Sequence, residues 1–192
     1  MIWKTVNKNI IHRLFYPTVP VIVVVRDNDT IGGMPANSCM PLSFNPPMIG
    51  LSVSPEHRTH KLLCNSKYFT INWVDWKYGI NIELLSSKTE KNNKNKISKA
   101  GFKTKQGKIY QTTVLEESVA VIECKVKKTQ SIGDHDLFIS EVLEAYASED
   151  FNEYWNFKTY SPALYLGIPT KTKLKMNSKL ILSKFLKIPS QK

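Results

Sequence analysis

The sequence predicts a mainly β protein: a closed antiparallel sheet, or β-barrel, with helical additions. Short apolar or alternating segments are separated by turn residues, and strands and helices do not alternate regularly along the chain. The absence of GxGxxG and GxxxxGK[ST] motifs argues against a doubly wound nucleotide-binding sheet. With 192 residues, 42% of them hydrophobic, the chain is long enough for one domain with a substantial core.

The first elements expected along the chain are a short helix and a buried strand. Residues 6–15 carry apolar side chains at helical spacing, and Pro17 ends that segment. The β-branched run at 19–25 is typical of a strand buried on both faces. After a turn, Gly32-Gly33 opens a second, shorter segment that leads into a loop at 37–40.

Further strands are expected on either side of a helix at 59–65. The segment at 48–54 follows Pro46-Pro47 and has the composition of a strand. The segment at 68–74 alternates, which predicts a half-buried strand with Phe69, Ile71 and Trp73 on one face. Later strands are predicted as a hairpin at 118–127 and 137–145 around a turn at 131–135, and as a final short strand at 160–167.

Charge divides the chain into a domain at 1–170 and a basic tail at 171–192. The net charge is +11, and the tail holds seven Lys and no acid, which leaves +4 for the domain. Residues 171–192 predict a basic amphipathic helix that packs on the body or on a second subunit, or else binds a membrane surface or nucleic acid. Residues 87–108 are rich in Lys and Asn and predict a surface insert, in which Ile97, Ala100 and Phe102 are able to anchor a short helix.

Cysteine and histidine spacing argues against disulfides and metal sites. Three Cys with no CxxC pair favour reduced thiols, and His57 and His60 lack a third ligand for zinc. The longest strongly apolar run, 19–25, is far shorter than the ~20 residues of a membrane-spanning helix. We therefore expect a soluble cytoplasmic protein without metal and without a membrane partner.

The segment from Pro35 to Thr59 is the most unusual part of the sequence. It holds five prolines, which donate no hydrogen bond and favour an open, irregular backbone. Backbone N–H groups near Ser38, Cys39 and Met40 are then available to a ligand. A flavin ring suits such a backbone, because its pyrimidine edge alternates acceptors with a donor and gains negative charge on reduction.

A phosphate site is one interpretation of the residues that follow. Ser52 and Ser54 face the same side of a strand, and Arg58 and Thr59 stand at the start of the predicted helix. Free N–H groups and a guanidinium at a helix N-terminus attract phosphate. The alternative is an ordinary strand-to-helix loop in which Thr59 is only the N-cap.

Five motifs in order resemble the flavin reductase-like family of FMN-binding split barrels, over roughly residues 10–167. They are the apolar strand from Pro17, the run from Asn37 to Pro47 with Ser52-Val53-Ser54 and Arg58-Thr59, the Phe69-Thr-Ile-Asn72 strand, Glu123-Cys124, and Gly133-Asp134-His135. The resemblance implies a Greek-key-like antiparallel split barrel that forms a homodimer with FMN near the interface. One departure is Ser140, which stands before Glu141-Val142 where the family often has Gly.

The resemblance also implies roles for particular residues. Asn37, Ser38, Cys39 and Met40 would line the isoalloxazine, mainly through backbone groups. Ser52, Val53 and Ser54 would run under the ribityl chain. Arg58 and Thr59 would hold the phosphate, with His60 or Lys61 as a further contact. His135 would lie where nicotinamide stacks on the flavin, although a lone His in this context is also typical of an exposed turn residue.

Three functions are weighed on this basis. The first is an NAD(P)H-dependent flavin reductase that transfers hydride from NADH or NADPH to FMN and supplies a partner oxygenase or another electron acceptor. The second is a non-enzymatic FMN-binding electron carrier similar to a flavoredoxin. The third, a nucleic-acid-binding module using the Lys-rich tail, is disfavoured because the body lacks interleaved aromatic and basic residues on a strand pair.

Overall fold

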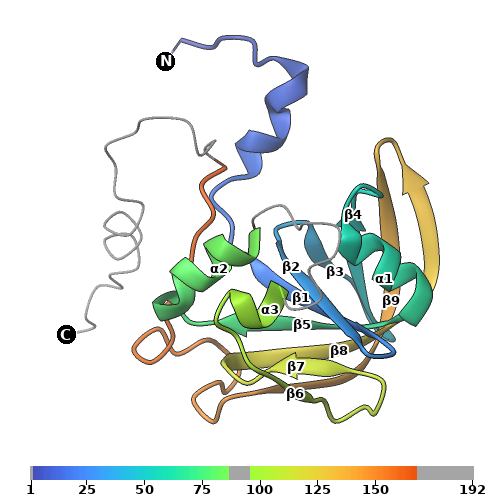
Figure 1. Ribbon diagram of the computed structural model, residues 1–192. Coiled ribbons are helices and arrows are strands. Elements are labelled where there is room, and N and C mark those ends of the chain that lie inside the picture. The colour runs from blue at the N-terminus through green and yellow to red at the C-terminus, as the bar shows by residue number, and fades with distance from the viewer. Residues whose placement is uncertain (1, 87–95, 168–192) are drawn as a thin grey trace.

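One antiparallel sheet of seven strands organises the chain (Figure 1). The computed structural model describes residues 2–86 and 96–167, so the predicted tail at 171–192 lies outside the described residues. The strand order across the sheet is β2-β1-β5-β8-β9-β4-β3. The strands are β1 (Val21–Asp27), β2 (Thr30–Ala36), β3 (Cys39–Phe44), β4 (Pro47–Val53), β5 (Tyr68–Val74), β8 (Ser118–Ile132) and β9 (His135–Ala147).

The two edge strands of this sheet are consecutive in the chain. β2 and β3 stand at opposite ends of the strand order, yet only Asn37 and Ser38 separate them. Because so short a link cannot cross a flat sheet of seven strands, the sheet must curl until its edges meet. The result is a barrel with a split between β2 and β3, which confirms the predicted fold class.

Strand β1 is buried on both faces, as its β-branched run predicted. Val21, Val23 and Val25 point into the barrel core, whereas Ile22 and Val24 belong to a second core. Helix α1 (Arg58–Ser66) contributes to the barrel core, and α2 (Gly79–Ser86) and α3 (Lys96–Lys99) contribute to the second core. In the described residues, no helix is long and apolar enough to cross a bilayer.

The expectation that β5 is half-buried is wrong, because both of its faces are covered. Phe69 and Ile71 lie in the barrel core, and the intervening Thr70 and Asn72 are fully buried on the other face. The Thr70 hydroxyl donates to the Thr113 carbonyl at 2.7 Å, and the Asn72 amide donates to the Ile22 carbonyl at 3.1 Å. The apolar residues of β5 therefore face the barrel core, and its polar residues face a second buried region in which they are hydrogen-bonded, instead of facing solvent.

The described part of the expected surface insert, 96–108, has exposed lysines at Lys99, Lys103 and Lys105 but is anchored to the body by a short helix. Ile97, Ala100 and Phe102 are at most 4% exposed and belong to the second core, so the alternative of an anchored helix is correct. The chain then forms a small hairpin of β6 (Thr104–Gln106) and β7 (Thr113–Leu115). Residues 87–95 lie outside the described residues.

The hairpin of β8 and β9 is longer than predicted. The strands continue through the expected turn at 131–135 until only Gly133 and Asp134 remain between them, and Gly133 takes the positive φ of 61° that the turn requires. The predicted strand at 160–167 is absent from the described chain, where isolated bridges join Thr18 to Tyr165 and Asp75 to Pro162.

The N-terminal helix and the proline-rich loop also differ from expectation. Lys8–Phe15 (η1) forms a 3-10 helix with no buried residue, because it packs against none of the described elements closely enough to cover its apolar side. The loop expected at 37–40 is shorter than predicted, since β3 begins at Cys39. The short 3-10 helix Trp76–Tyr78 (η2) and helix α2 were not predicted.

Candidate functional site

The predicted ring and ribityl segments are joined by hydrogen bonds across β3 and β4. The Ser52 N–H donates to the Ser38 carbonyl at 3.0 Å, and the Ser38 hydroxyl donates to the Ser52 carbonyl at 2.6 Å. The neighbouring Asn37 accepts a hydrogen bond at Oδ1 from the Thr18 hydroxyl at 3.0 Å. The loop that closes the barrel is therefore held in a defined position beside β4.

The backbone of Cys39 is directed away from β4, toward the split in the barrel. The bond between Ser52 and Ser38 makes this pair a hydrogen-bonded pair of the antiparallel ladder. Such pairs alternate with pairs whose N–H and C=O groups point outward, and Cys39 opposite Leu51 is of the second kind. Pro41 faces the same way, where its missing N–H costs no ladder bond. One N–H on this edge is thus presented to a ligand.

The side chains of Cys39 and Val53 are in no position to do chemistry on a ligand. Val53 is 1% exposed and belongs to the barrel core, and Cys39 packs against that core. Burial raises the pKa of the Cys39 thiol to about 12, so it stays protonated at neutral pH. Met40, by contrast, is 50% exposed. Cys39 and Val53 are left to act through their backbone groups.

Helix α1 starts at the end of β4 without a side-chain cap. The His57 N–H donates to the Ser54 carbonyl at 3.0 Å, and the turn delivers Arg58 as the first helical residue. His57 is the N-cap and its side chain makes no capping hydrogen bond. Thr59 is inside the helix, so the alternative interpretation of Thr59 as an N-cap is wrong. The first turn keeps N–H groups that an anion is able to satisfy.

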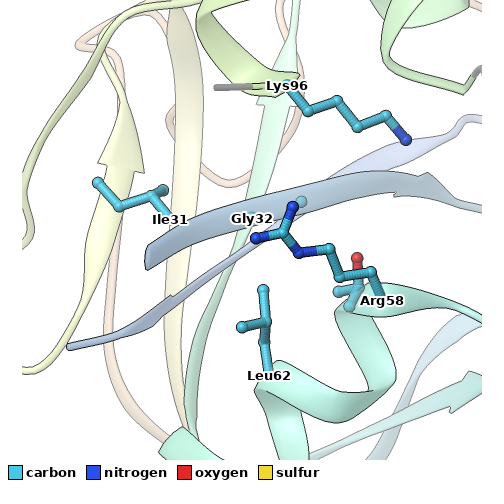
Figure 2. Close-up of a pocket in the computed structure, with 7 residues that line it drawn as sticks. Ile31, Gly32, Arg58, Leu62 and Lys96 are labelled. Atoms are coloured by element: carbon cyan, nitrogen blue, oxygen red, sulfur yellow. The ribbon is translucent and has the colours of Figure 1, made fainter. Parts of the chain in front are cut away.

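A small hollow adjoins this helix start and carries two cationic side chains (Figure 2). Thr59 lines it and is only 4% exposed, and its hydroxyl makes no hydrogen bond to another residue within 2–86 and 96–167. The residues around the hollow come from β2, α1 and α3: Ile31, Gly32, Gly33, Arg58, Thr59, Leu62 and Lys96.

Two glycines of β2 let α1 and α3 approach the edge of the sheet from its two faces. A Cβ on Gly32 would lie 2.3 Å from Leu62 Cδ1, a side chain of α1. A Cβ on Gly33 would lie 2.6 Å from the Val23 carbonyl oxygen and 3.3 Å from Ile97 Cδ1 of α3. The glycine pair is what allows the two helices to bring Arg58 and Lys96 to one hollow.

His60 lies beside the site but is engaged elsewhere. It is 9% exposed, and its Nε2 is 2.7 Å from Asp136 Oδ2 at the start of β9. Asp136 also accepts a hydrogen bond from the Ser131 hydroxyl at 2.6 Å, and the contacts with Ser131 and His60 lower the pKa of Asp136. His60 therefore ties α1 to the β8–β9 hairpin, and its contact with a phosphate stays a prediction.

His135 is brought to the same end of β4. Asp136, the next residue, pairs with Val53 across β4 and β9, so His135 lies beside the point where β4 leads to Ser54. The His135 ring is part-exposed, and its Nδ1 is 2.8 Å from Asp134 Oδ1, a contact that lowers the pKa of the Asp134 carboxyl. The structure thus brings the predicted nicotinamide-side residue close to the predicted ribityl segment.

Lys96 is the residue of this arrangement that the sequence did not single out. It stands among the many lysines of 87–108, and nothing in its local pattern distinguishes it. The Gly32-Gly33 pair was a visible signal, although it predicted only a chain segment. No group of His, Cys, Asp and Glu able to hold a metal occurs in the described part of the chain, His57 and His60 included.

Comparison with known proteins gives the family context of this geometry. Residues 12–166 match the family described as flavin reductase like domain. An uncharacterized protein of Aeropyrum pernix is 31% identical over 165 residues, which are 85% of this chain and 63% of that protein. A ferric-chelate reductase (NAD(P)H) of Archaeoglobus fulgidus is 27% identical over 129 residues, 67% of this chain and 75% of that protein.

Among solved structures, the fold is similar to that of an FMN-binding protein from Thermus thermophilus crystallised with p-hydroxybenzaldehyde. The TM-score is 0.73 with 24% sequence identity, and the match covers 88% of this chain and 92% of that one.

Proposed function

This chain belongs to the flavin reductase-like family, and we propose that it binds FMN and reduces it with NADH or NADPH. The observation that carries the proposal is the convergence of the predicted site segments along β4. Ser38 is hydrogen-bonded to Ser52 of β4. A turn that begins at Ser54 leads to Arg58, the first residue of α1. Asp136 pairs with Val53, so His135 lies beside the end of β4. The segments predicted to contact the ring, the ribityl chain, the phosphate and the nicotinamide therefore all adjoin the C-terminal end of β4.

The residues present suit FMN at both ends of this path. At the split, the outward N–H of Cys39 is a donor for the pyrimidine edge of the ring, flanked by Asn37, Ser38 and the exposed Met40. At α1, Arg58, the Thr59 hydroxyl and the N–H groups of a helix start without a side-chain cap suit a phosphate. FMN, when bound, supplies a ring that accepts hydride from a nicotinamide and returns electrons singly or in pairs.

The protein's own contribution is positioning and electrostatics. The N–H at Cys39 would stabilise negative charge on the pyrimidine edge, and the buried thiol beneath it excludes water without competing as a nucleophile. His135 would orient the nicotinamide from the β8–β9 hairpin, held in place through Asp134. The name of the Archaeoglobus fulgidus relative, which specifies NAD(P)H, supports a nicotinamide as electron donor.

The proposal includes a homodimer and a cytoplasmic location. The edge strand β3 exposes Met40, Leu42 and Phe44 at 50%, 41% and 90%, which suits contact with a second subunit near the flavin. The free thiols of Cys39, Cys64 and Cys124 suit a reducing compartment. A partner oxygenase or another acceptor would take the electrons.

The visible spectrum and the oxidation of NAD(P)H together test the function. The purified protein, supplied with FMN and freed of excess flavin by gel filtration, should show the visible absorbance of bound flavin. It should then oxidise NADH or NADPH in proportion to protein concentration, above a control of FMN alone.

The outcomes separate the alternatives. A protein that binds FMN but oxidises neither nucleotide would be an electron carrier rather than a reductase. A protein that stays colourless and does not bind added FMN would overturn the proposal as a whole. Salt-sensitive binding of an oligonucleotide in place of flavin would support the nucleic-acid hypothesis.

A further inference from the structure

We propose that Cys64 is a reactive thiol that forms a mixed disulfide with a low-molecular-weight disulfide, with His60 as the base that takes its proton and Asp136 as the residue that positions His60. Cys64 and His60 lie one turn apart on α1, and the fold brings Asp136 of β9 to them. The proposed flavin chemistry uses none of these side chains in this way, so the inference is independent of flavin binding.

The first support is an unbroken row of polar contacts that ends at the Cys64 sulfur. Cys64 Sγ lies 3.8 Å from His60 Nδ1, a contact in which the thiol is able to donate. The other ring nitrogen, Nε2, lies 2.7 Å from Asp136 Oδ2, and Asp136 Oδ1 accepts a hydrogen bond from the Ser131 hydroxyl at 2.6 Å. The His60 ring packs edge-on against Phe138 with the ring centroids 5.3 Å apart, which fixes its orientation.

The second support is the tautomer that Asp136 imposes on His60. Contacts with the Ser131 hydroxyl and with His60 lower the pKa of Asp136, so its carboxyl group is ionised at neutral pH and only accepts hydrogen bonds. The hydrogen of a neutral His60 ring is therefore on Nε2, which leaves a lone pair on Nδ1 facing the Cys64 thiol. A nucleophile, a base and a group that orients the base thus stand in line.

The third support is the contrast between Cys64 and the other two cysteines. Cys124 is fully buried in the barrel core and Cys39 packs against it, and burial raises the pKa of both thiols. Cys64 packs at the edge of the same core but is part-exposed. Its helix carries Arg58 and Lys61 and no acid. Because nearby positive charge stabilises a thiolate, which is the nucleophilic form, Cys64 is the cysteine best placed to react.

The exchange step balances without a further reactant. The Cys64 proton moves to His60 Nδ1, and the thiolate attacks one sulfur of a disulfide R–S–S–R. A new S–S bond joins Cys64 to one half, the old S–S bond breaks, and the other half leaves as a thiolate that takes the proton from His60. Cys64 is oxidised to the mixed disulfide, and the departing half is reduced to a thiol. Because Cys64 is only part-exposed, a small disulfide reaches it more readily than a disulfide within a folded protein.

The experiment follows the reaction of the reduced full chain with glutathione disulfide by intact mass, and peptide mapping identifies the modified cysteine. A short unstructured peptide with one cysteine gives the reference rate. We expect one adduct per chain, at Cys64, formed about 10-fold faster than the adduct of the peptide. Cys39 and Cys124 should stay unmodified over the same period, which also shows that the chain remains folded.

Two variants test the neighbours of Cys64. His60→Gln should slow its modification about 10-fold, because no base remains beside the thiol, and Asp136→Asn should slow it roughly 3-fold, because the imidazolium loses its counter-charge. His57→Gln is the matched control, since it removes an exposed histidine at the N-cap of α1 whose side chain makes no capping hydrogen bond. A merely loosened structure would expose Cys64 and speed the reaction, so a slower rate reports the loss of the base.

Two results would overturn the inference. One is a rate at Cys64 no faster than that of the peptide, and the other is an equal rate in the unmodified chain, His60→Gln and Asp136→Asn. If His60→Gln unfolds, modification of Cys39 and Cys124 will reveal it, and Asp136→Asn then decides. FMN binding and NAD(P)H oxidation are measured separately, so failure of the flavin function would leave this result unchanged.

Discussion

The two edges of the barrel sheet, β2 and β3, meet at the same corner and are finished in opposite ways. The β2 edge carries Gly32 and Gly33, is covered by α1 and α3 and faces a hollow with two cations. The β3 edge is covered by no described helix and exposes Met40, Leu42 and Phe44. The unpaired backbone groups of an uncovered edge strand are able to pair with another chain, which leads to association or aggregation. Helices cover the β2 edge, whereas the β3 edge is left open for such contacts.

The difference shows that positive charge and exposed apolar side chains are separated between the two edges of the sheet. The covered edge gathers positive charge next to a helix N-terminus, which suits the anionic end of a cofactor. The open edge offers an outward backbone N–H and apolar side chains, which suits a planar ring and a second subunit. The following predictions break or sharpen this contrast.

The largest effect is expected from removing the charge of α1 at the covered edge. Arg58→Gln should raise the dissociation constant of FMN about 100-fold and leave riboflavin binding nearly unchanged, because a charge-assisted contact to phosphate is lost. Lys99→Gln, which removes a positive charge from an exposed lysine of α3 that does not line the hollow, is the control. Equal weakening of FMN and riboflavin would show that the covered edge does not hold the phosphate.

Close packing on the covered edge is tested by adding one methyl group at a time. Gly33→Ala should lower the free energy of unfolding by about 2–3 kcal/mol, because its Cβ would meet the Val23 carbonyl oxygen at 2.6 Å, an atom held by the sheet. Gly32→Ala should cost about 1 kcal/mol, because Leu62 is able to rotate away. Urea denaturation measures both, and the reverse order would contradict the packing described for β2.

The open edge is tested by removing its apolar side chains. Leu42→Ser combined with Phe44→Ser should weaken self-association about 10-fold, measured by sedimentation equilibrium, without lowering the unfolding temperature of the dilute protein. Tyr154→Ser, which removes an 81% exposed aromatic outside β3, is the control. Unchanged association in the double variant would mean that subunits meet elsewhere.

The smallest effect expected is a dependence of FMN affinity on alkaline pH. Lys96 would contact a phosphate in its charged form, and burial lowers the pKa of Lys96, so it loses its proton at a lower pH than an exposed lysine. The affinity for FMN should therefore fall roughly 3-fold as pH rises from about 8 to about 10. The decline should be weaker in Lys96→Gln, and an identical profile in both proteins would contradict the prediction.

Local pattern was sufficient for the elements whose environment is simple. The apolar run of β1, the hairpin of β8 and β9 and helix α1 were expected from sequence, because each has a strong period or a clear turn. For β5 the same reasoning failed, since Thr70 and Asn72 satisfy their polar groups in a second core instead of in water. Alternation of apolar and polar residues shows that the two faces of a strand lie in different environments, but it does not show whether the polar face meets solvent or a second core.

The phosphate end of the site shows what sequence reasoning reaches and what it misses. Arg58 and Thr59 are adjacent in the sequence at the start of a predicted helix, so their common position was predictable. Lys96 joins them only because α1 and α3 pack on opposite faces of β2 at two glycines. A contact that depends on three elements distant in sequence leaves no local trace.

The two-residue link between β2 and β3 limits how the barrel is able to move. Ala36 and Cys39 are separated by three peptide units, which span at most about 11 Å when fully extended. The two edges therefore stay close at this corner in any folded state. Any widening of the split to admit or release a bound molecule is therefore a hinge motion about Asn37 and Ser38. The largest displacement would occur at the far ends of the two strands, at Thr30 of β2 and Phe44 of β3.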